Sequence, residues 1–486
     1  MLGCLRNITG VTLMNRNKKL SSHTKGTLQH LESFLEVLLL SVVYYIVWRH
    51  GYDDSNFPPY MGNGKYVLVG VYAVLCYLFI KNSDGFQFGQ LRRADLCVAQ
   101  WISILIVNAI TYFQLCLIAN GMVSVLPMLL LTLLDVVIAT VCIYVYKAVY
   151  QALYAPYNMV MIYGSRNAAG MKLKMDSRRD KYQVNHLISV DKGLDYICSQ
   201  LSKYDAVVLN DVPPQIRNDI VKYCYQHGIR LYVVPKITDI ILKNAEDIST
   251  FDTPMQLVHG QGLTVGQRFA KRTLDIILCL FAMVIAAPIM AAVAIAIKLE
   301  DGGPAFYKQK RVTVNNREFD VLKFRSMIVD AEKFTGAVLA SEDDPRITKV
   351  GRFIRATRLD ELPQILNILK GDMTWVGPRP ERMKFIEEFC QEIPEFAYRT
   401  KVKAGLTGYA QIYGKYNTSP YDKLRLDLMY IEHCSIILDI KLILTTVRIL
   451  FSKESTEGID VAEQNQQKLD AMLDELQGQE FSGAAK

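Results

Sequence analysis

IILCLFAMVIAAPIMAAVAIAI, residues 276–297, is the longest apolar run of the chain. Its length matches the ~20 residues that an α-helix needs to cross a bilayer core. Pro288 lies near its centre, where proline removes a backbone hydrogen bond and bends or breaks a helix. Lys271, Arg272 and Lys298 lie at its two ends. The run therefore predicts a membrane segment that either crosses the bilayer or enters it and returns.

Four further apolar runs lie in the first third of the chain, and tyrosine or tryptophan flanks the first two, as at membrane interfaces. A single run of this kind could be a buried helix of a soluble protein, but four in succession make that interpretation weak. The composition agrees, with 51% hydrophobic residues and a mean hydropathy of +0.13. We predict a four-helix transmembrane bundle within residues 1–150, with its spans at about 35–48, 66–80, 101–118 and 123–146.

The distribution of basic residues predicts which side of the membrane each loop between these spans faces. Cytoplasmic loops of membrane proteins carry an excess of Lys and Arg. The leader before the first span and the loop after the second are basic, whereas the opposite side carries only Arg49 and Lys65. We therefore expect an uncleaved, cytoplasmic N-terminus and a cytoplasmic chain after the fourth span. The basic residues in question are Arg6, Arg16, Lys18, Lys19 and Lys25 in the leader, and Lys81, Arg92 and Arg93 in the loop.

This orientation decides between the two interpretations of residues 276–297. A fifth crossing would export the basic segment 298–325 and everything after it, against the charge rule. We therefore predict a re-entrant helix over residues 270–299 that breaks at Ala287 and Pro288 and returns to the cytoplasmic side.

Charge and cysteine content exclude several protein classes. The 10 cysteines form no C-x-x-C pair, which argues against a disulfide or zinc framework. The net charge of +7 suits a protein that lies on anionic membrane lipids and handles phosphorylated substrates. No nucleic-acid-binding motif accompanies the charge, so we expect no nucleic-acid partner.

Short β-rich runs alternate with helical stretches between residues 151 and 252, which predicts a Rossmann-like α/β domain with a parallel sheet. Its first turn, YGSRNAAG, contains Gly164 and Gly170 but lacks the G-x-G-x-x-G pattern of dinucleotide sites. We therefore expect a structural or regulatory role for this domain.

RATRLDELPQILNILKGDMTWVGPRPE, residues 355–381, holds the candidate catalytic residues. Asp360 and Glu361 precede Pro363, and proline is tolerated only in the first turn of a helix. We therefore expect both acids at a helix N-terminus, close to Arg352, Arg355 and Arg358. That setting favours an ionised Asp360 beside a bound phosphate, as a nucleophile or a magnesium ligand. The alternative is an acid pair on a solvated helix face.

Further bases lie in stiff or regular segments. Arg379 stands between two prolines, so its guanidinium is well placed to bind phosphate in a bidentate fork. Lys323 and Arg325 alternate along a predicted strand, which would place them on one face, and an Asn315-Asn316 turn precedes that strand. Surface charge near the membrane is the alternative for each base.

The segments KRTLDI, GGPAFYKQKRV, KFRSM, TRLDELPQ, GDMTWVGPRPE and KAGLTGYAQ closely resemble the bacterial sugar transferase family, the monotopic phosphoglycosyl transferases. The resemblance covers about residues 268–452, and the preceding segments resemble its long form, the polyisoprenyl-phosphate hexose-1-phosphate transferases. It implies a multi-domain membrane protein whose α+β monotopic catalytic domain, residues 265–452, has a re-entrant membrane helix. An acidic C-terminal tail, residues 453–486, would follow.

The family reaction transfers a sugar 1-phosphate from a UDP-sugar to undecaprenyl phosphate and releases UMP. By resemblance, Asp360 attacks phosphorus, Glu361 helps to hold Mg²⁺ or the substrate, and both acids are candidate metal ligands. The implied substrate-binding residues are Lys323, Arg325, Arg355, Arg358, Gln364, Arg379 and, more weakly, Asp427. One departure is Ala404, where the family often has proline, and we expect it to loosen a loop.

The implied location is the cytoplasmic face of the bacterial inner membrane, at the first step of exopolysaccharide, capsule or O-antigen synthesis. A homodimer is compatible with this architecture. Two rival functions remain open: a membrane-anchored nucleotide-sugar dehydratase, which would need an intact glycine fingerprint, and a non-catalytic scaffold of a polysaccharide synthase. No residue of the sequence selects glucose, galactose or another hexose.

Overall fold

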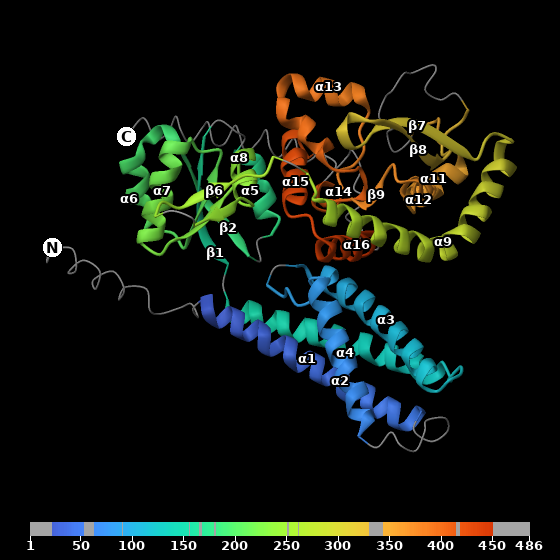
Figure 1. The fold of residues 1–486 in the computed structure, drawn as a ribbon. Helices are drawn as coiled ribbons and strands as arrows, with labels where there is room; N and C mark the ends of the chain where they lie inside the picture. Colours follow the sequence, from blue (N-terminus) through green and yellow to red (C-terminus); the bar gives the residue numbers. More distant parts are fainter. Residues whose placement is uncertain are drawn as a thin grey trace. The chain divides into compact units, whose positions relative to one another are not determined.

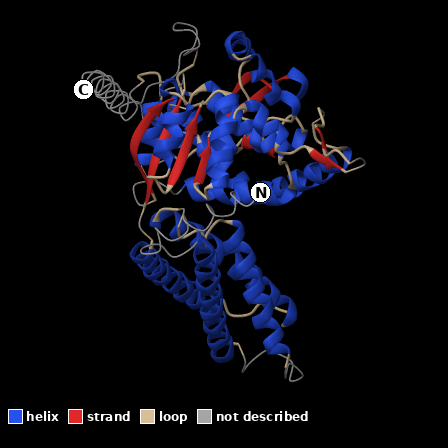
Figure 2. Ribbon diagram, turned by 90° about the vertical axis from the view of Figure 1, so that its left-hand side faces the viewer, coloured by secondary structure: helices blue, strands red, loops and turns tan. Residues whose placement is uncertain are grey.

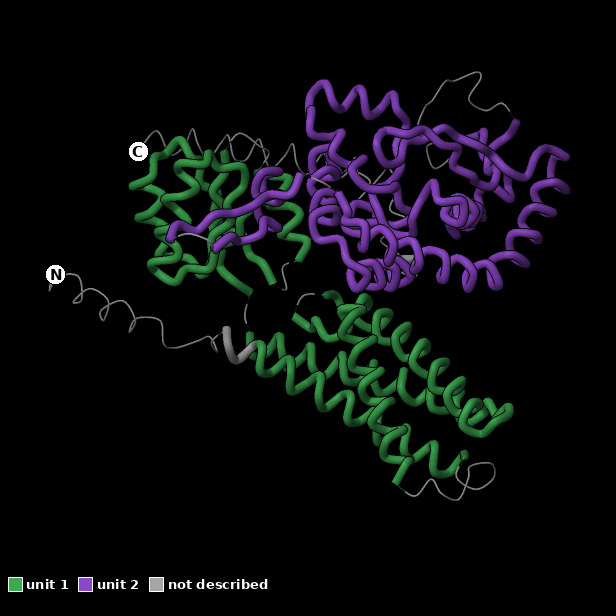
Figure 3. Tube along the Cα trace, viewed as in Figure 1, with its two compact units in different colours: residues 1–234 green, residues 235–486 purple. Residues whose placement is uncertain are grey.

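A computed structural model of the protein divides the chain into two compact units, residues 1–234 and residues 235–486 (Figure 3). Each unit is described by itself. Residues 1–21 of the predicted basic leader and the acidic tail lie outside the described residues. The structure describes residues 22–52, 63–89, 91–154, 156–164, 168–178, 181–249, 252–260, 262–329, 344–414 and 418–450.

Four long helices open the first unit, and each is long and apolar enough to cross a membrane. They pack in a closed ring, because α1 contacts α2 and α4, and α3 contacts α2 and α4. Leucine, isoleucine, tyrosine and tryptophan side chains fill the space between them, while other large apolar side chains face outwards. The helices are α1 (Ser22–Gly51), α2 (Gly64–Asn82), α3 (Arg93–Ile118) and α4 (Leu126–Leu153).

A buried polar cluster joins three of these helices. The Tyr72 hydroxyl lies 2.7 Å from Asp135 Oδ2 and 3.0 Å from Asn108 Oδ1. The Asn108 amide in turn donates to Asp135 Oδ2 and to the Thr132 hydroxyl. Hydrogen bonds of this kind hold apolar helices together where lipid offers no competing partner.

The rest of the first unit contains a four-stranded parallel sheet in the order β2-β1-β3-β4. Alternate residues of a strand face opposite sides, so Val160 and Ile162 pack with α6 and α7, whereas Met159 and Met161 pack with α5. The four predicted β-rich runs are these four strands. The elements are β1 (Tyr157–Tyr163), β2 (Tyr182–Ser189), β3 (Ala206–Asn210), β4 (Arg230–Val233), α5 (Ala168–Asp176), α6 (Leu194–Leu201) and α7 (Pro214–Gln226).

The second unit begins at Pro235 with α8 (Ile237–Leu242), which packs on α15. A short antiparallel pair follows, β5 (Glu246–Ile248) and β6 (Met255–Leu257). Figure 2 shows the strands of the protein in red and its helices in blue.

Helix α9 (Val265–Asp301) contains the opening apolar run. A capping box between Thr264 and Gln267 starts it, and Gly302, with a positive φ of 72°, ends it. The expected break at Ala287 and Pro288 is wrong, because the helix continues through both residues. Pro288 lies inside the helix, where a proline favours a bend, and Figure 1 shows α9 turning partway along its length.

A β-hairpin follows α9. Its strands, β7 (Phe306–Val312) and β8 (Glu318–Phe324), pair antiparallel over their full length. The predicted Asn315-Asn316 turn is confirmed, and both asparagines have positive φ, at 57° and 58°. Asparagine tolerates this left-handed conformation better than most residues.

Short elements carry the acid pair and the loops around it, and longer helices complete the unit around a core that includes Phe396, Leu424 and Tyr430. The elements are α11 (Lys349–Ala356), η4 (Leu359–Glu361), α12 (Gln364–Lys370), β9 (Thr374–Val376), α13 (Met383–Glu392), η5 (Pro394–Lys401), β10 (Gly405–Thr407), α14 (Tyr409–Tyr413), α15 (Pro420–Glu432) and α16 (Ile436–Leu450).

Candidate active site

The acid pair lies in a short 3-10 turn, η4, rather than at the start of an α-helix. Helix α12 begins at Gln364, with Pro363 as its N-cap. The expectation that one helix begins near Asp360 and carries both acids is therefore wrong. Proline has no N–H to donate, so the backbone continues through tighter bonds, such as those from Leu362 and Ile365 to the carbonyls three residues earlier.

The residue before this turn has a strained backbone. Arg358 has a φ of 58° and lies in the left-handed region, although it is not glycine. Such a conformation costs about 1–3 kcal/mol and is concentrated at functional sites. Arg358 is the N-cap of η4 and lies between the end of α11 and the acid pair.

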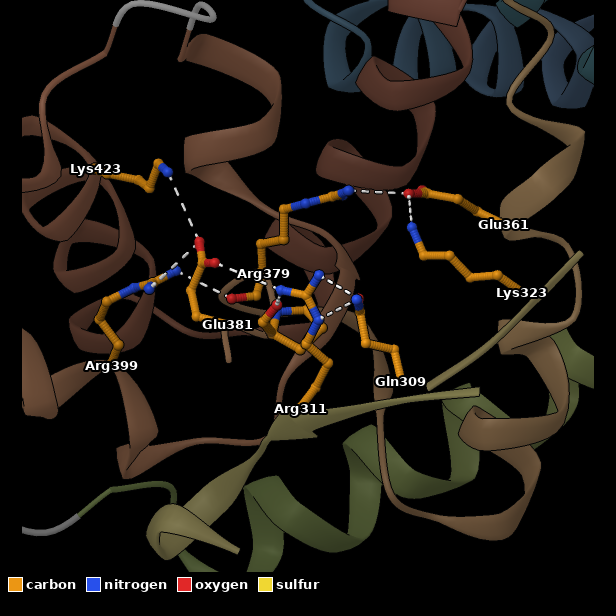
Figure 4. Close-up of polar contacts among 9 residues, drawn as sticks. Gln309, Arg311, Lys323, Glu361, Arg379, Glu381, Arg399 and Lys423 are labelled. Atoms are coloured by element: carbon orange, nitrogen blue, oxygen red, sulfur yellow. Dashed lines mark hydrogen bonds and ion pairs between the residues drawn. The ribbon is translucent and has the colours of Figure 1, made fainter. Parts of the chain in front are cut away.

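Two bases bind the Glu361 carboxylate. Lys323 Nζ and Arg379 Nη2 each lie 2.9 Å from Glu361 Oε1 (Figure 4). Burial opposes ionisation of this carboxyl group, but the positive charges of Arg379 and Lys323 outweigh it and hold the pKa of Glu361 well below its ordinary value. Glu361 is therefore an ionised acceptor that joins strand β8 to the loop after β9.

Asp360 has a different environment. Within the part of the chain that the structure describes, no hydrogen bond or ion pair reaches its carboxylate. Burial, together with the neighbouring charge of Glu361, raises the pKa of Asp360. The charges of Lys323, Arg355 and Arg358 act in the opposite direction. Asp360 is therefore a half-buried carboxylate with free lone pairs, and the positive charges of three bases act on it.

Backbone contacts fix the loop that carries Arg379. Strands β9 and β10 pair in parallel, and Gly405 donates to the Pro378 carbonyl. Gly377 and Gly405 approach so closely that a Cβ on Gly405 would lie 2.0 Å from the Gly377 nitrogen. Glycine is therefore required here, and the closeness of the two backbones limits movement of the loop.

Side chains hold the same loop from the other side (Figure 4). Arg399 Nη2 donates to the Arg379 carbonyl over 3.1 Å, and Arg311 Nη1 donates to the Pro380 carbonyl over 3.2 Å. The Glu381 carboxylate lies within 4.0 Å of three bases, namely Arg311, Arg399 and Lys423.

Asp427 supports the loop that carries Arg379 indirectly, through Arg399. Its carboxylate is buried and accepts a hydrogen bond of 2.6 Å from Arg399 Nε. Among the described residues, the hydrogen bond and ion pair of Asp427 go to Arg399 and not to the acid pair, so the geometry does not support its assignment to substrate binding. Asp427 orients Arg399, which in turn holds the backbone of Arg379.

A family model described as bacterial sugar transferase matches residues 266–453. A putative undecaprenyl-phosphate N-acetylgalactosaminyl 1-phosphate transferase of Bacillus subtilis is 53% identical over 129 residues, which are 26% of this chain and 72% of the relative. The chain belongs to the bacterial sugar transferase family.

Longer relatives in this family match over a smaller share of their length. A UDP-N-acetylgalactosamine-undecaprenyl-phosphate N-acetylgalactosaminephosphotransferase of Aeromonas hydrophila is 42% identical over 187 residues, 38% of this chain and 44% of the relative. A UDP-glucose:undecaprenyl-phosphate glucose-1-phosphate transferase of Escherichia coli (strain K12) is 38% identical over 205 residues, 41% of this chain and 42% of the relative. The chain thus matches less than half the length of these two relatives.

The remaining predicted residues of the sugar transferase region occupy different places. Arg355 lies on α11 and Gln364 is buried at the start of α12. Strand β8 ends at Phe324, so the strand alternation that would pair Arg325 with Lys323 does not extend to Arg325. Arg325 is buried and donates to Asp301 at the end of α9 instead.

Ala404 does not loosen its loop. Its N–H donates to the Thr313 hydroxyl over 3.2 Å, and that hydroxyl donates to the Asp372 carbonyl over 2.9 Å. A proline at position 404 could not make the first of these bonds. The departure from the family pattern therefore adds a contact between the hairpin and the loop before β10.

Polar contacts tie both ends of α9 to this same unit. Near its start, Lys271 Nζ lies 2.6 Å from Asp439 Oδ2, and Asp275 accepts hydrogen bonds from Thr374 and Trp375. Near its end, Glu300 accepts from the backbone of Lys349 and Val350 at the start of α11, and Asp301 pairs with Arg325. The apolar run thus begins and ends on one folded unit.

The metal-binding capacity of the site is limited. Over the described residues, no group of three or more His, Cys, Asp or Glu side chains could hold a metal ion. Magnesium, however, is often held by one or two carboxylates, water and substrate phosphates. Asp360 fits that mode, because its oxygens are free, whereas Oε1 of Glu361 already accepts from two bases.

Sequence reasoning missed several residues of the site. Glu381 lies inside the quoted motif, but nothing in its spacing shows that three bases surround it. Arg311, Arg399 and Lys423 come from a strand and two helical segments far away in the chain. Arg311 and Glu381 both lie inside segments that carry the family resemblance, GGPAFYKQKRV and GDMTWVGPRPE, whereas Arg399 and Lys423 lie outside them.

Proposed function

We propose that the protein transfers a sugar 1-phosphate from a UDP-sugar to undecaprenyl phosphate and releases UMP, at the cytoplasmic face of the bacterial inner membrane. The names of the relatives support undecaprenyl phosphate as acceptor and a UDP-sugar as donor. The observation that carries the proposal is the unequal environment of the acid pair: Asp360 has free oxygens, whereas two bases bind Glu361.

The first step uses the free carboxylate. An Asp360 oxygen attacks the phosphorus that bears the sugar, a P–O bond to Asp360 forms, and the phosphoanhydride bond breaks to release UMP. In-line attack needs an ionised carboxylate. Burial and the charge of Glu361 raise the pKa of Asp360, and the charges of Lys323, Arg355 and Arg358 counteract that rise in part. The product is a phosphosugar held on the enzyme as an acyl phosphate.

The second step regenerates Asp360. A phosphate oxygen of undecaprenyl phosphate attacks the same phosphorus, and the bond to Asp360 breaks, giving undecaprenyl-diphosphate sugar. Glu361 holds Lys323 and Arg379 at fixed positions beside the reacting phosphorus, where their charges offset the charge that develops on its oxygens. Magnesium bound at Asp360 and the substrate diphosphate would supply further charge neutralisation.

The two anchored ends of α9 support the proposed membrane geometry. Asp275 and Asp301 contact the same folded unit, although an apolar run long enough to cross a bilayer lies between them. A straight crossing would separate those ends by the bilayer thickness, about 30 Å. A bent α9 that enters and leaves on one side keeps both ends, and hence Asp360, on the cytoplasmic face.

UMP release tests the function directly. Purified full-length protein in nanodiscs that contain undecaprenyl phosphate should release UMP from one member of a panel of UDP-sugars. The reaction should also yield a lipid-linked sugar of matching mass. Absence of UMP release with every UDP-sugar of the panel would reject the proposal in favour of a scaffold role. Binding of NAD would point to a dehydratase instead.

A further inference from the structure

Two basic side chains converge on Gly371, the residue that ends α12 with a positive φ of 95°. A Cβ placed on Gly371 would lie 3.5 Å from Arg272 Nη2 and 3.8 Å from Lys403 Nζ. The Arg272 guanidinium donates to the carbonyls of Ile368 and Leu369, in the last turn of α12, over 2.6 Å each. A guanidinium has five N–H donors, so these two bonds fix its position without using all of its capacity.

Lys403 has no partner for its charge. Within the described part of the chain, neither a hydrogen bond nor an ion pair reaches its ammonium group. Burial, together with the positive charge of Arg272, lowers the pKa of Lys403. The Asp275 carboxylate opposes this shift, but its hydrogen bonds come from Thr374 and Trp375. A half-buried charge without a partner is costly, and an anion between Lys403 and Arg272 would offset both the burial and the repulsion.

Arg317 and Lys370 add positive charge to the same region. Arg317 Nη2 lies 2.8 Å from Asp372 Oδ1, and Lys370 Nζ lies 3.1 Å from Asp372 Oδ2, so one carboxylate pairs with two exposed bases. The charge of Arg317 also acts on Lys403. The end of α12 therefore carries an excess of positive charge, which favours an anionic ligand over a zwitterionic one.

The position of this basic cluster on α9 selects a ligand of the membrane. Arg272 precedes Ile276, where the apolar run begins, by four residues, or about 6 Å at the α-helical rise. The proposed function places that run in the bilayer, and the present inference rests on this placement. The cluster then lies at the level of the lipid headgroups, where basic pockets bind the phosphate groups of anionic lipids.

Undecaprenyl phosphate is a less suitable occupant of the cluster. Asp360 lies before the start of α12 and Gly371 lies at its end, and the seven residues between Gln364 and Lys370 span about 10.5 Å. The proposed reaction requires the phosphate of the acceptor at Asp360. An anion bound over Gly371 is therefore a different molecule.

We propose that Arg272 and Lys403 bind the phosphate of an anionic glycerophospholipid over Gly371, and that Arg317 and Lys370 add charge around this site. The bound lipid holds the end of α12 at the membrane surface, beside the start of α9. Helix α12 packs on both α9 and β8, the strand that carries Lys323. The lipid thereby fixes the height of the acid pair above the bilayer.

Native mass spectrometry of the detergent-solubilised full chain, titrated with phosphatidylglycerol, tests the proposal. Lys403→Gln should bind phosphatidylglycerol about fivefold more weakly than wild type, which is the effect of one lysine near an anionic lipid. Lys403→Arg should bind it as wild type does, because the positive charge remains. The matched control, Lys384→Gln, removes the same charge at an exposed position on α13 and should also match wild type.

Chemical labelling of the wild type provides a second measurement that needs no variant. In nanodiscs of phosphatidylglycerol, Lys403 should react more slowly with acetic anhydride than in nanodiscs of phosphatidylcholine, because the bound phosphate covers its amine. Lys384 should react at the same rate in both. Equal labelling of Lys403 in the two lipids, or equal phosphatidylglycerol binding by Lys403→Gln and wild type, would overturn the proposal.

Three further ligands separate the sources of phosphate. Phosphatidylcholine should bind weakly to every variant, and inorganic phosphate should not displace phosphatidylglycerol. Binding of undecaprenyl phosphate should not depend on the charge at position 403. Displacement by inorganic phosphate, or a preference for undecaprenyl phosphate that is lost in Lys403→Gln, would reject a glycerophospholipid as the occupant.

UMP release distinguishes this inference from the proposed function. A protein that binds phosphatidylglycerol through Lys403 but releases no UMP from any UDP-sugar would reject the proposed function and leave the lipid site in place. A protein that releases UMP but binds phosphatidylglycerol equally with lysine or glutamine at position 403 would reject the lipid site alone.

Discussion

Asp360 and Glu361 are neighbours in the chain, yet the pKa values of their carboxyl groups are shifted in opposite directions. Burial and the charge of Glu361 raise the pKa of Asp360, whereas Arg379 and Lys323 hold the pKa of Glu361 below its ordinary value. Geometry separates them, because Lys323 and Arg379 bind Glu361 at 2.9 Å each and leave the Asp360 oxygens free. Glu361 is therefore a structural anchor for two bases, whereas Asp360 is available as a nucleophile.

Asp360→Asn should abolish UMP release, because an amide does not attack phosphorus. By comparison with the loss of other catalytic nucleophiles, the fall should be roughly 10⁴-fold or more. The melting temperature should stay the same or rise, because the change removes a half-buried charge without a partner. UMP assays and thermal unfolding measure the two effects, and Glu388→Gln on the exposed face of α13 is the control. Full activity of the Asp360 variant would reject the mechanism.

The acid side of the pH–rate profile should report Asp360. Attack needs the carboxylate, so activity should be lost as pH falls through the pKa of Asp360, which is higher than that of an ordinary aspartate. Glu361→Gln removes a negative neighbour, so the pKa of Asp360 should fall and the acid limb should move to lower pH. Arg355→Met should move it to higher pH. If the acid limbs of the two variants shifted in the same direction, or did not shift from that of the wild type, this electrostatic assignment would be contradicted.

Arg379→Ala should weaken nucleotide-sugar binding more than it slows the chemical step. Hydrogen bonds to charged groups contribute about 1.5–3 kcal/mol, which corresponds to a KM about 10- to 100-fold higher. Arg379→Lys should recover part of this loss, because one charge remains but the fork is gone. Steady-state kinetics with varied UDP-sugar measure the effect. An unchanged KM in the alanine variant would mean that Arg379 serves Glu361 alone.

Asp427→Ala should destabilise the second unit, because it leaves the buried guanidinium of Arg399 without its carboxylate. Removing one partner of a buried ion pair typically costs about 3–5 kcal/mol. The double variant Arg399→Met/Asp427→Leu should recover most of that stability and still show a raised KM, because the Arg379 carbonyl loses its donor. Chemical denaturation and kinetics separate the two effects. A double variant with wild-type KM would show that Arg399 only stabilises the fold.

Cysteine labelling should place both ends of α9 on the cytoplasmic side. Arg268→Cys and Lys298→Cys introduce thiols at exposed positions on either side of the apolar run, in a background without native cysteines. Both should react with a membrane-impermeant maleimide in inside-out vesicles and neither should react in intact cells. Labelling of position 298 from outside would show that α9 crosses the membrane.

Local pattern was sufficient for much of the fold. The apolar helices, the four strands of the parallel sheet and the Asn315-Asn316 turn follow from periodicity, run length and the conformational tolerance of asparagine, which are properties of neighbouring residues. The acid pair and Arg379 were also evident, because they lie within one quoted motif. Pro288 was interpreted as a break, but a helix loses just one hydrogen bond there and bends through it.

The sequence by itself determined which segments are apolar helices and which residues are candidates for the chemistry. Only the tertiary structure decided which basic side chain pairs with which carboxylate. Lys323 lies 38 positions before Glu361 and Arg399 lies 28 positions before Asp427, so their pairing depends on how strands and loops pack rather than on spacing. The long-range contacts of Lys323 and Arg379 occupy the Glu361 carboxylate and leave the Asp360 oxygens free. The ionisation of each carboxylate depends on the charges and the burial that folding brings to it.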